Sequence, residues 1–154
     1  MLLIVIYLLL VTVGYLAVLG IFVVEQSVWL EPYRVGFICA AIGGMGGCVY
    51  CLRGVYLSVS VRRNWSREWY IWYFLRPIVS AICGAVSYVF LRAGLLILES
   101  GTRPDASEMG FYALAFIAGL NVDKFVSKIE DIAQAVWGIE KSRASKTGNE
   151  GEQK

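Results

Sequence analysis

Three long apolar runs dominate the pattern of hydrophobic and polar positions along the chain, at residues 1–24, 35–52 and 77–98. Each is close to or longer than the roughly 18–20 residues that a helix needs to cross the hydrocarbon core of a bilayer. Lipid offers backbone N–H and C=O groups no hydrogen-bond partner, so a spanning segment must satisfy them within its own helix. The pattern therefore predicts an all-α fold, a polytopic membrane helix bundle.

A fourth helix is predicted from residue 106, because Asp105 and Glu108 have the spacing of a helix N-cap and its third helical residue. Its apolar part, 109–120, is shorter than a full span and has the length of a re-entrant or buried segment. Apolar residues then keep the a/d spacing of a coiled coil at Val122, Phe125, Ile129, Ile132 and Val136. We therefore expect one continuous helix over 106–140 that crosses the membrane and continues as a cytoplasmic amphipathic helix.

These elements predict one membrane domain over residues 1–141. Its spans lie at about 1–24, 35–58, 77–98 and 106–121, with an amphipathic extension at 122–140. Residues 142–154 are polar and contain glycine, which predicts a disordered tail.

The charges of the connections predict the orientation of the chain. The connection 53–76 carries five arginines against one glutamate, whereas the connections 25–34 and 99–108 each carry more acids than bases. Basic connections stay in the cytoplasm, which places 53–76 inside and the other two outside. With four spans, both termini are then expected in the cytoplasm.

Composition excludes several classes of function. At 58% hydrophobic residues and a mean hydropathy of +0.62, the chain is too apolar for an ordinary soluble domain. It has no histidine, and neither a phosphate-binding glycine loop nor a nucleophile beside a base appears, so we expect no enzyme, no cofactor and no metal site. The net charge of +2 indicates no nucleic acid partner. Cys48 and Cys51 form a C-x-x-C inside a membrane helix, which indicates packing rather than redox chemistry.

Small residues on the second helix form two stripes, a pattern that lets helix backbones approach closely. One stripe is Gly36, Ala40, Gly44 and Cys48, and the other is Gly43, Gly47 and Cys51. The third helix offers a matching surface at Ser80, Ala81, Gly84 and Ala85. Two interpretations stay open: packing within one chain, and a subunit interface or pore lining.

Arg92 is the charge that the apolar pattern places well inside a span. An arginine at such a depth usually faces protein, water or a route to the headgroups. It either extends outward or pairs with an acid such as Glu99, or it lines an aqueous path or binds an anion or a lipid headgroup.

Two further surfaces are candidates for interactions. The arginines of 53–76 set the topology or form a docking surface for a soluble cytoplasmic partner. For the C-terminal amphipathic helix we expect self-association, packing on its own chain or binding to the lipid surface. Its lysines are offset by acids, which weakens the lipid interpretation.

The motif Trp-Tyr-Phe-Leu-Arg-Pro at 72–77 is followed by Arg-Ala-Gly-Leu at 92–95 and by an A-x-A-F-x-A-G element at 113–119. In these motifs, within residues 40–135, the chain resembles small uncharacterised bacterial multi-pass inner-membrane proteins. The resemblance implies a bacterial inner-membrane setting and supplies no activity.

The sequence thus leaves three functional hypotheses for a protein whose partners are the lipid bilayer and further copies of itself. The first is an oligomeric channel or pore with the C-terminal helices gathered at its inner mouth. The second is a non-conducting scaffold or accessory subunit that recruits a soluble partner. The third is a holin-like or phage-exclusion protein.

Overall fold

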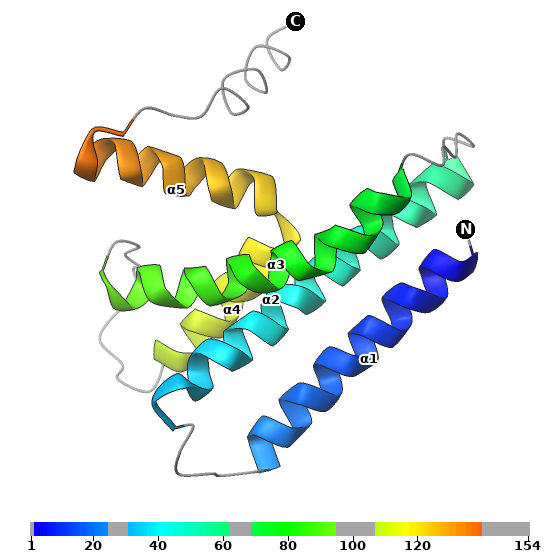
Figure 1. Cartoon of the computed structure of the whole chain (residues 1–154), viewed down its shortest axis with the longest axis horizontal. Helices are drawn as coiled ribbons and strands as arrows, with labels where there is room; N and C mark the ends of the chain where they lie inside the picture. Colours follow the sequence, from blue (N-terminus) through cyan, green and yellow to red (C-terminus); the bar gives the residue numbers. More distant parts are fainter. Residues whose placement is uncertain (1, 25–30, 62–68, 95–106, 140–154) are drawn as a thin grey trace, which may run out of the picture. The chain divides into compact units, whose positions relative to one another are not determined.

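The computed structural model describes residues 2–24, 31–61, 69–94 and 107–139, which form helices and no strand. The helices are α1 (Leu2–Val24), α2 (Glu31–Tyr56), the short π-helix η1 (Leu57–Val61), α3 (Trp69–Arg92), α4 (Ser107–Leu120) and α5 (Val122–Trp137) (Figure 1). The predicted all-α fold is confirmed for these residues. Three helices, α1, α2 and α3, are long and apolar enough to span a membrane, and the number is four if α4 and α5 together make one span. The predicted tail 142–154 lies outside the described residues.

The start of α3 corrects the predicted third span. The predicted span begins at Pro77, but α3 begins at Trp69 and contains Pro77 in its interior. The aromatic residues before the proline pack against α1, and this tertiary contact extends the helix through a position that proline disfavours. Figure 1 shows α3 bent along its length. Proline explains the bend, because it removes one hydrogen bond of the helix and crowds the preceding turn.

The end of α3 corrects the predicted position of Arg92. The Gly94 N–H donates to the Leu91 carbonyl at 3.0 Å, and Gly94 has a φ of 71°, the left-handed conformation that commonly ends a helix. Arg92 is therefore an exposed residue in the last turn of α3, at the end of the candidate span Tyr70–Arg92 rather than well inside it.

The predicted continuous helix over 106–140 is also wrong, because Asn121 interrupts it. The Asn121 N–H still donates to the Ile117 carbonyl at 2.9 Å, but Asn121 itself adopts a turn between α4 and α5. Asparagine favours turns because its side chain competes for backbone hydrogen bonds. The contacts of the chain divide here into two units, Met1–Val122 and Asp123–Lys154.

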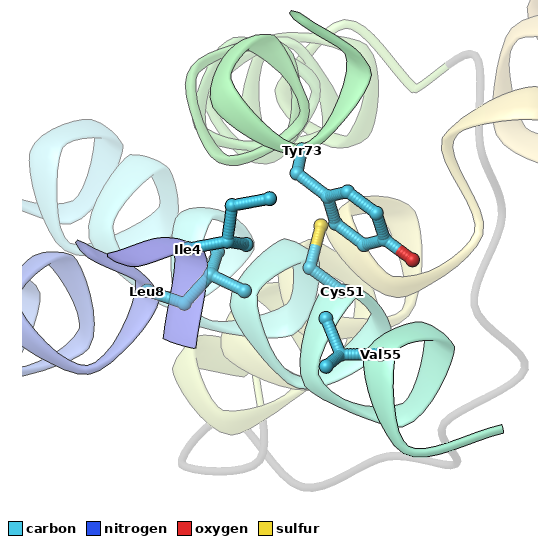
Figure 2. Packing of buried hydrophobic residues seen from close by; sticks show 5 residues of the cluster. All are labelled: Ile4, Leu8, Cys51, Val55 and Tyr73. Carbon is cyan, nitrogen blue, oxygen red and sulfur yellow. The ribbon is translucent and has the colours of Figure 1, made fainter. Parts of the chain in front are cut away.

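In the first unit, α2 packs against α3, α4 and α1 (Figure 1). Half of the residues in the most apolar stretch of α2 are buried, compared with 11% of those in the corresponding stretch of α1. Most of the α1 surface therefore faces outward. One core cluster joins α1, α2 and α3 and consists of Ile4, Leu8, Cys51, Val55 and Tyr73. Figure 2 shows these side chains converging from the three helices.

Two tyrosines bond α1 to α3 around the proline. The Tyr7 hydroxyl donates to the Phe74 carbonyl at 3.3 Å, and the Tyr15 hydroxyl donates to the Pro77 carbonyl at 3.2 Å. The Tyr7 ring also stacks on the Phe74 ring, with the ring centroids 5.0 Å apart. Directional bonds therefore hold a helix that buries little of its own surface.

Helix α5 has the predicted amphipathic pattern. Val122 and Phe125 are buried, and the next members of the a/d series, Ile129 and Ile132, are half-buried. Val136 is exposed, so the apolar face becomes more accessible toward the end of the helix. The helix ends at Trp137, before the predicted boundary at residue 140.

Candidate functional site

Three helices meet backbone to backbone at Gly43 of α2, Gly84 of α3 and Gly119 of α4, here called the glycine junction. A Cβ added to Gly43 would lie 2.7 Å from both the Gly84 Cα and the Ser80 carbonyl oxygen. A Cβ added to Gly119 would collide with the Gly43 carbonyl. Any larger residue would force the helices apart, and such close packing is what drives helices together when lipid supplies no hydrophobic effect between them.

The remaining glycines of the predicted stripes also contact helices of the same chain. A Cβ on Gly44 would collide with the Tyr15 ring of α1, and one on Gly47 would collide with the Ser80 side chain. Gly36 lies opposite Tyr88, at 3.4 Å from its added Cβ. Ala40 is half-buried. Gly43, Gly44 and Gly47 are buried, which leaves these three no surface for a second copy, and the structure favours the intrachain interpretation at these positions.

The glycine junction lies halfway along α2 and α3. Gly43 is in the middle of the uncharged run 35–52, and Gly84 is in the middle of the uncharged run 77–91. Phe111, near the start of α4, packs edge-on against Tyr88 near the end of α3, with ring centroids 5.6 Å apart. Helix α4 therefore runs from one end of α3 to its middle. Its 14 residues make a length of about 21 Å, short of the roughly 30 Å of a hydrocarbon core.

A buried hydrogen bond fixes the end of α4. The Ser80 hydroxyl of α3 donates to the Gly119 carbonyl at 2.9 Å. Carbonyls in the last turn of a helix lack partners within the helix, and a buried one needs a donor from elsewhere. Ser80 thus caps the C-terminus of α4, where the backbone hydrogen bonds of that helix end.

Arg76 lies one helical turn before Ser80 on α3, and its side chain is only 6% exposed. The guanidinium carbon lies 4.8 Å from the ring centroid of Tyr50 and 5.2 Å from that of Trp72. A cation–π contact contributes about 0.5–2 kcal/mol. Two of them offset much of the roughly 2.5–3.5 kcal/mol that an arginine costs at the centre of a spanning helix.

The sequence pattern predicts that Arg76 belongs to the cytoplasmic connection 53–76, because the third span is predicted to begin at Pro77. The structure places Arg76 inside α3 and inside the candidate span Tyr70–Arg92. The signal that would have found it is the spacing of Trp72, Arg76 and Ser80, which puts an aromatic ring, a cation and a hydroxyl on one helix face.

Arg92 makes only a local contact among the described residues. Its guanidinium donates to the Tyr88 hydroxyl at 2.9 Å, one turn back on the same helix. Its suggested partner Glu99 lies outside the described residues. Of the two arginines within α3, Arg76 is thus the one that the bundle buries.

The described residues contain no group of three or more potential metal-ligating side chains. The four cysteines are buried and carry free thiols. Comparisons with family models, with curated proteins and with solved structures find no match. Two polar features stand out among the described residues. One is the end of α4, which the Ser80 hydroxyl caps, and the other is the buried cation Arg76, one turn away on α3.

The glycine junction predicts that Gly43→Ala destabilises the bundle by about 1–3 kcal/mol, because the helices must separate to admit the methyl group. The matched control is Gly14→Ala on α1, where an added Cβ meets nothing within 4 Å. Alanine is the better helix former, so the control should be neutral or up to about 1 kcal/mol more stable. Circular dichroism during unfolding in mixed detergent and SDS micelles measures both. Equal effects of the two changes would contradict the close approach.

Removing the cap gives a second test. Ser80→Ala deletes the bond to Gly119 and should cost about 0.6–1.7 kcal/mol, the range for hydrogen bonds between membrane helices. Ser87→Ala is the control, because the Ser87 hydroxyl donates at 2.7 Å to Gly84 of its own helix. The same unfolding measurement should give a smaller loss for Ser87→Ala. A larger loss there would show that Ser80 does not fasten α4.

Proposed function

We propose that this chain is a subunit of an oligomeric membrane channel whose water-filled vestibule reaches the middle of the bilayer. The observation that carries the proposal is the end of α4, which lies halfway along α2 and α3 and is held there by Ser80. Helices that stop inside the bilayer are typical of channels and transporters, where they border a polar path.

Polar residues follow this end at once. Asn121 is exposed, and the charged residues Asp123 and Lys124 come within about 14 Å of chain from Leu120, at about 3.4 Å per residue. With the two uncharged runs centred in the bilayer, α4 ends near its midplane. Backbone outside a regular helix is tolerated at that depth only where protein buries it or water reaches it. A vestibule open to the side on which the chain leaves the bilayer supplies that water.

The path runs between copies of the chain rather than through one copy. The glycine junction closes the space between α2, α3 and α4 by direct backbone contact, so these three helices leave no opening at the middle of the unit. Helix α5 provides the means of association, because its a/d face ends in the exposed Val136, and two further exposed apolar residues, Trp137 and Ile139, lie next to it and just beyond the helix. We infer that the α5 helices of several copies associate with one another.

Arg76 fits the same proposal. It is a buried cation within a candidate span, one turn from the carbonyl end of α4. Intramembrane charges usually mark the path of an ion or substrate. A positive charge near the wall of the vestibule favours anions over cations.

The setting follows from the charges and motifs of the sequence. The four arginines of 53–76 that lie outside α3 favour a cytoplasmic location for the connection between α2 and α3, and hence for both termini. The resemblance of the motifs at 72–77, 92–95 and 113–119 favours a bacterial inner membrane.

The non-conducting scaffold is the second candidate, and the closed glycine junction favours it as well. A bundle without an internal path anchors α5 equally well as a docking element for a soluble partner. The two functions differ in whether water and ions reach the end of α4.

Cysteine labelling tests the vestibule. In proteoliposomes, Asn121→Cys should react with a charged, membrane-impermeant thiol reagent, and labelling should reduce ion flux. Ile82→Cys is the control, because Ile82 lies between Ser80 and Gly84 on α3 and is 58% exposed on the outer surface of the bundle. It should neither react nor change the flux. The native cysteines are buried, so the unchanged protein provides the blank.

The outcomes of this labelling separate the two candidates. No reaction at Asn121→Cys would overturn the vestibule. Reaction without ion flux at any applied potential would overturn conduction and leave the scaffold. If conduction is found, Arg76→Gln should shift the reversal potential toward that of cations, and an unchanged potential would remove Arg76 from the path.

Association through α5 is tested by Val136→Asp, which places a charge on the apolar face. The mass of the detergent-solubilised particle, measured by light scattering, should fall to that of one chain. Gln134→Asp is the control, because Gln134 is also exposed and lies two positions away on the polar face. It should leave the mass unchanged. A single-chain mass for the unchanged protein would contradict the oligomer itself.

A further inference from the structure

Helix α2 carries an exposed cation, Arg53, on the face that meets the end of α4. Gly46 marks this face, because a Cβ added to it would lie 2.5 Å from the Phe116 carbonyl oxygen and 2.9 Å from the Leu120 nitrogen. Seven residues make almost two whole turns of a helix, so Arg53 projects from the same face as Gly46. It lies about 10 Å farther along α2, at 1.5 Å per residue.

Helix α4 points toward the end of α2 that carries Arg53. Near its start, Phe111 packs against Tyr88 of α3, and Tyr88 also lies opposite Gly36 near the start of α2. The end of α4 lies at Gly46, farther along α2. Helix α4 therefore runs in the same direction as α2 and stops before it. Beyond this point α2 and α3 continue side by side (Figure 1).

The face of α2 that α4 covers becomes accessible beyond the end of α4. Gly46 is buried under α4, whereas Arg53 is exposed. Cys51 and Val55, two positions before and after Arg53, belong to the core cluster with α1 and α3, so Arg53 points away from α1. Arg53 therefore faces the region in front of the α4 end, where Asn121 begins the polar continuation of the chain.

Arg53 also lies at a depth where its surroundings matter. The candidate span of α2 runs from Tyr33 to Val59, and Arg53 stands six residues before its end, about 9 Å of helix. An arginine within a span usually faces protein or water. Its exposure leaves water as the medium, and the vestibule of the proposed function supplies that water. This step rests on the proposed function.

The charges in front of α4 favour anions. The carbonyl end of a helix carries the equivalent of about half a negative charge. Arg53 and the buried Arg76, one turn from this end on α3, together outweigh it. Asp123 and Lys124, which follow α4 in the sequence, offset each other. Rings of arginine or lysine are the usual basis of anion selectivity in pores.

We propose that Arg53 is the residue that contacts small anions in the vestibule, as the exposed counterpart of the buried Arg76. Its guanidinium donates charge-assisted hydrogen bonds to an anion that enters from the side where α2 ends. In an oligomer each copy contributes one Arg53. The ring of guanidinium groups then lies between the end of α4 and the membrane surface, where it selects the sign of the permeating ion.

The charge preference of thiol labelling at Asn121→Cys tests this role without any measurement of ion flux. Two methanethiosulfonate reagents are compared in proteoliposomes at low salt, one with a sulfonate and one with a trimethylammonium group, each present on both sides of the membrane. The ratio of their rate constants, sulfonate over trimethylammonium, should fall about fourfold when Arg53→Gln is added. This is the preference for an anion over a cation that one positive charge about 10 Å away produces in water.

Two variants serve as controls. Arg53→Lys keeps the charge and should keep the ratio. Arg92→Gln removes an exposed arginine at the other end of α3 and should also leave the ratio unchanged. A ratio that Arg53→Gln does not change, or that Arg92→Gln lowers equally, would overturn the role of Arg53 and leave the vestibule in place. No labelling of Asn121→Cys by either reagent would overturn the vestibule itself, and the role of Arg53 with it.

Discussion

The bundle depends on how closely three helix backbones approach at Gly43, Gly84 and Gly119. In lipid, helices gain little from hiding apolar side chains from each other, because the solvent is equally apolar. The remaining source of stability is van der Waals contact between the helices. Glycine makes this contact close where α2, α3 and α4 meet, because it has no side chain. Because each of these glycines faces backbone, the depth of α4 is set by the junction and not by the length of its apolar run.

That depth determines where the polar chemistry begins. With Gly119 fixed at the middle of α2 and α3, α4 ends inside the bundle rather than at its edge, and Ser80 caps it there. A longer α4 would run past the middle of α2 and α3, whereas a shorter one would lose the junction. The short apolar stretch of the fourth helix is therefore explained by the place where it must stop.

The local patterns of the sequence predict the helices well and their meeting points poorly. The apolar runs predict α1 and α2, and the a/d series predicts the helical character of α5. The small residues of the third helix correctly indicate the surface on which the second helix packs. The errors cluster on α3, where the sequence pattern predicts a helix start at Pro77, a residue that lies inside the helix. That boundary leaves Arg76 outside the predicted third span, and the predicted end at residue 98 places Arg92 well inside it. The local signal for Gly119 is its spacing of four from Ala115, a small-xxx-small pattern. Its contact, the Gly43 carbonyl, lies on another helix and carries no signal near Gly119 in the sequence.

Arg76 and Arg92 differ in burial because Arg76 has one more aromatic neighbour. Each has an aromatic residue four positions earlier, Trp72 before Arg76 and Tyr88 before Arg92, so α3 uses the same local pairing at two places. At Arg92 the pairing stands alone at an exposed helix end. At Arg76 a ring from α2, Tyr50, joins it, and the cation becomes buried. Such a cation is difficult to remove from a membrane helix without also loosening α2 from α3. Its burial therefore has a structural consequence whether or not ions pass beside it.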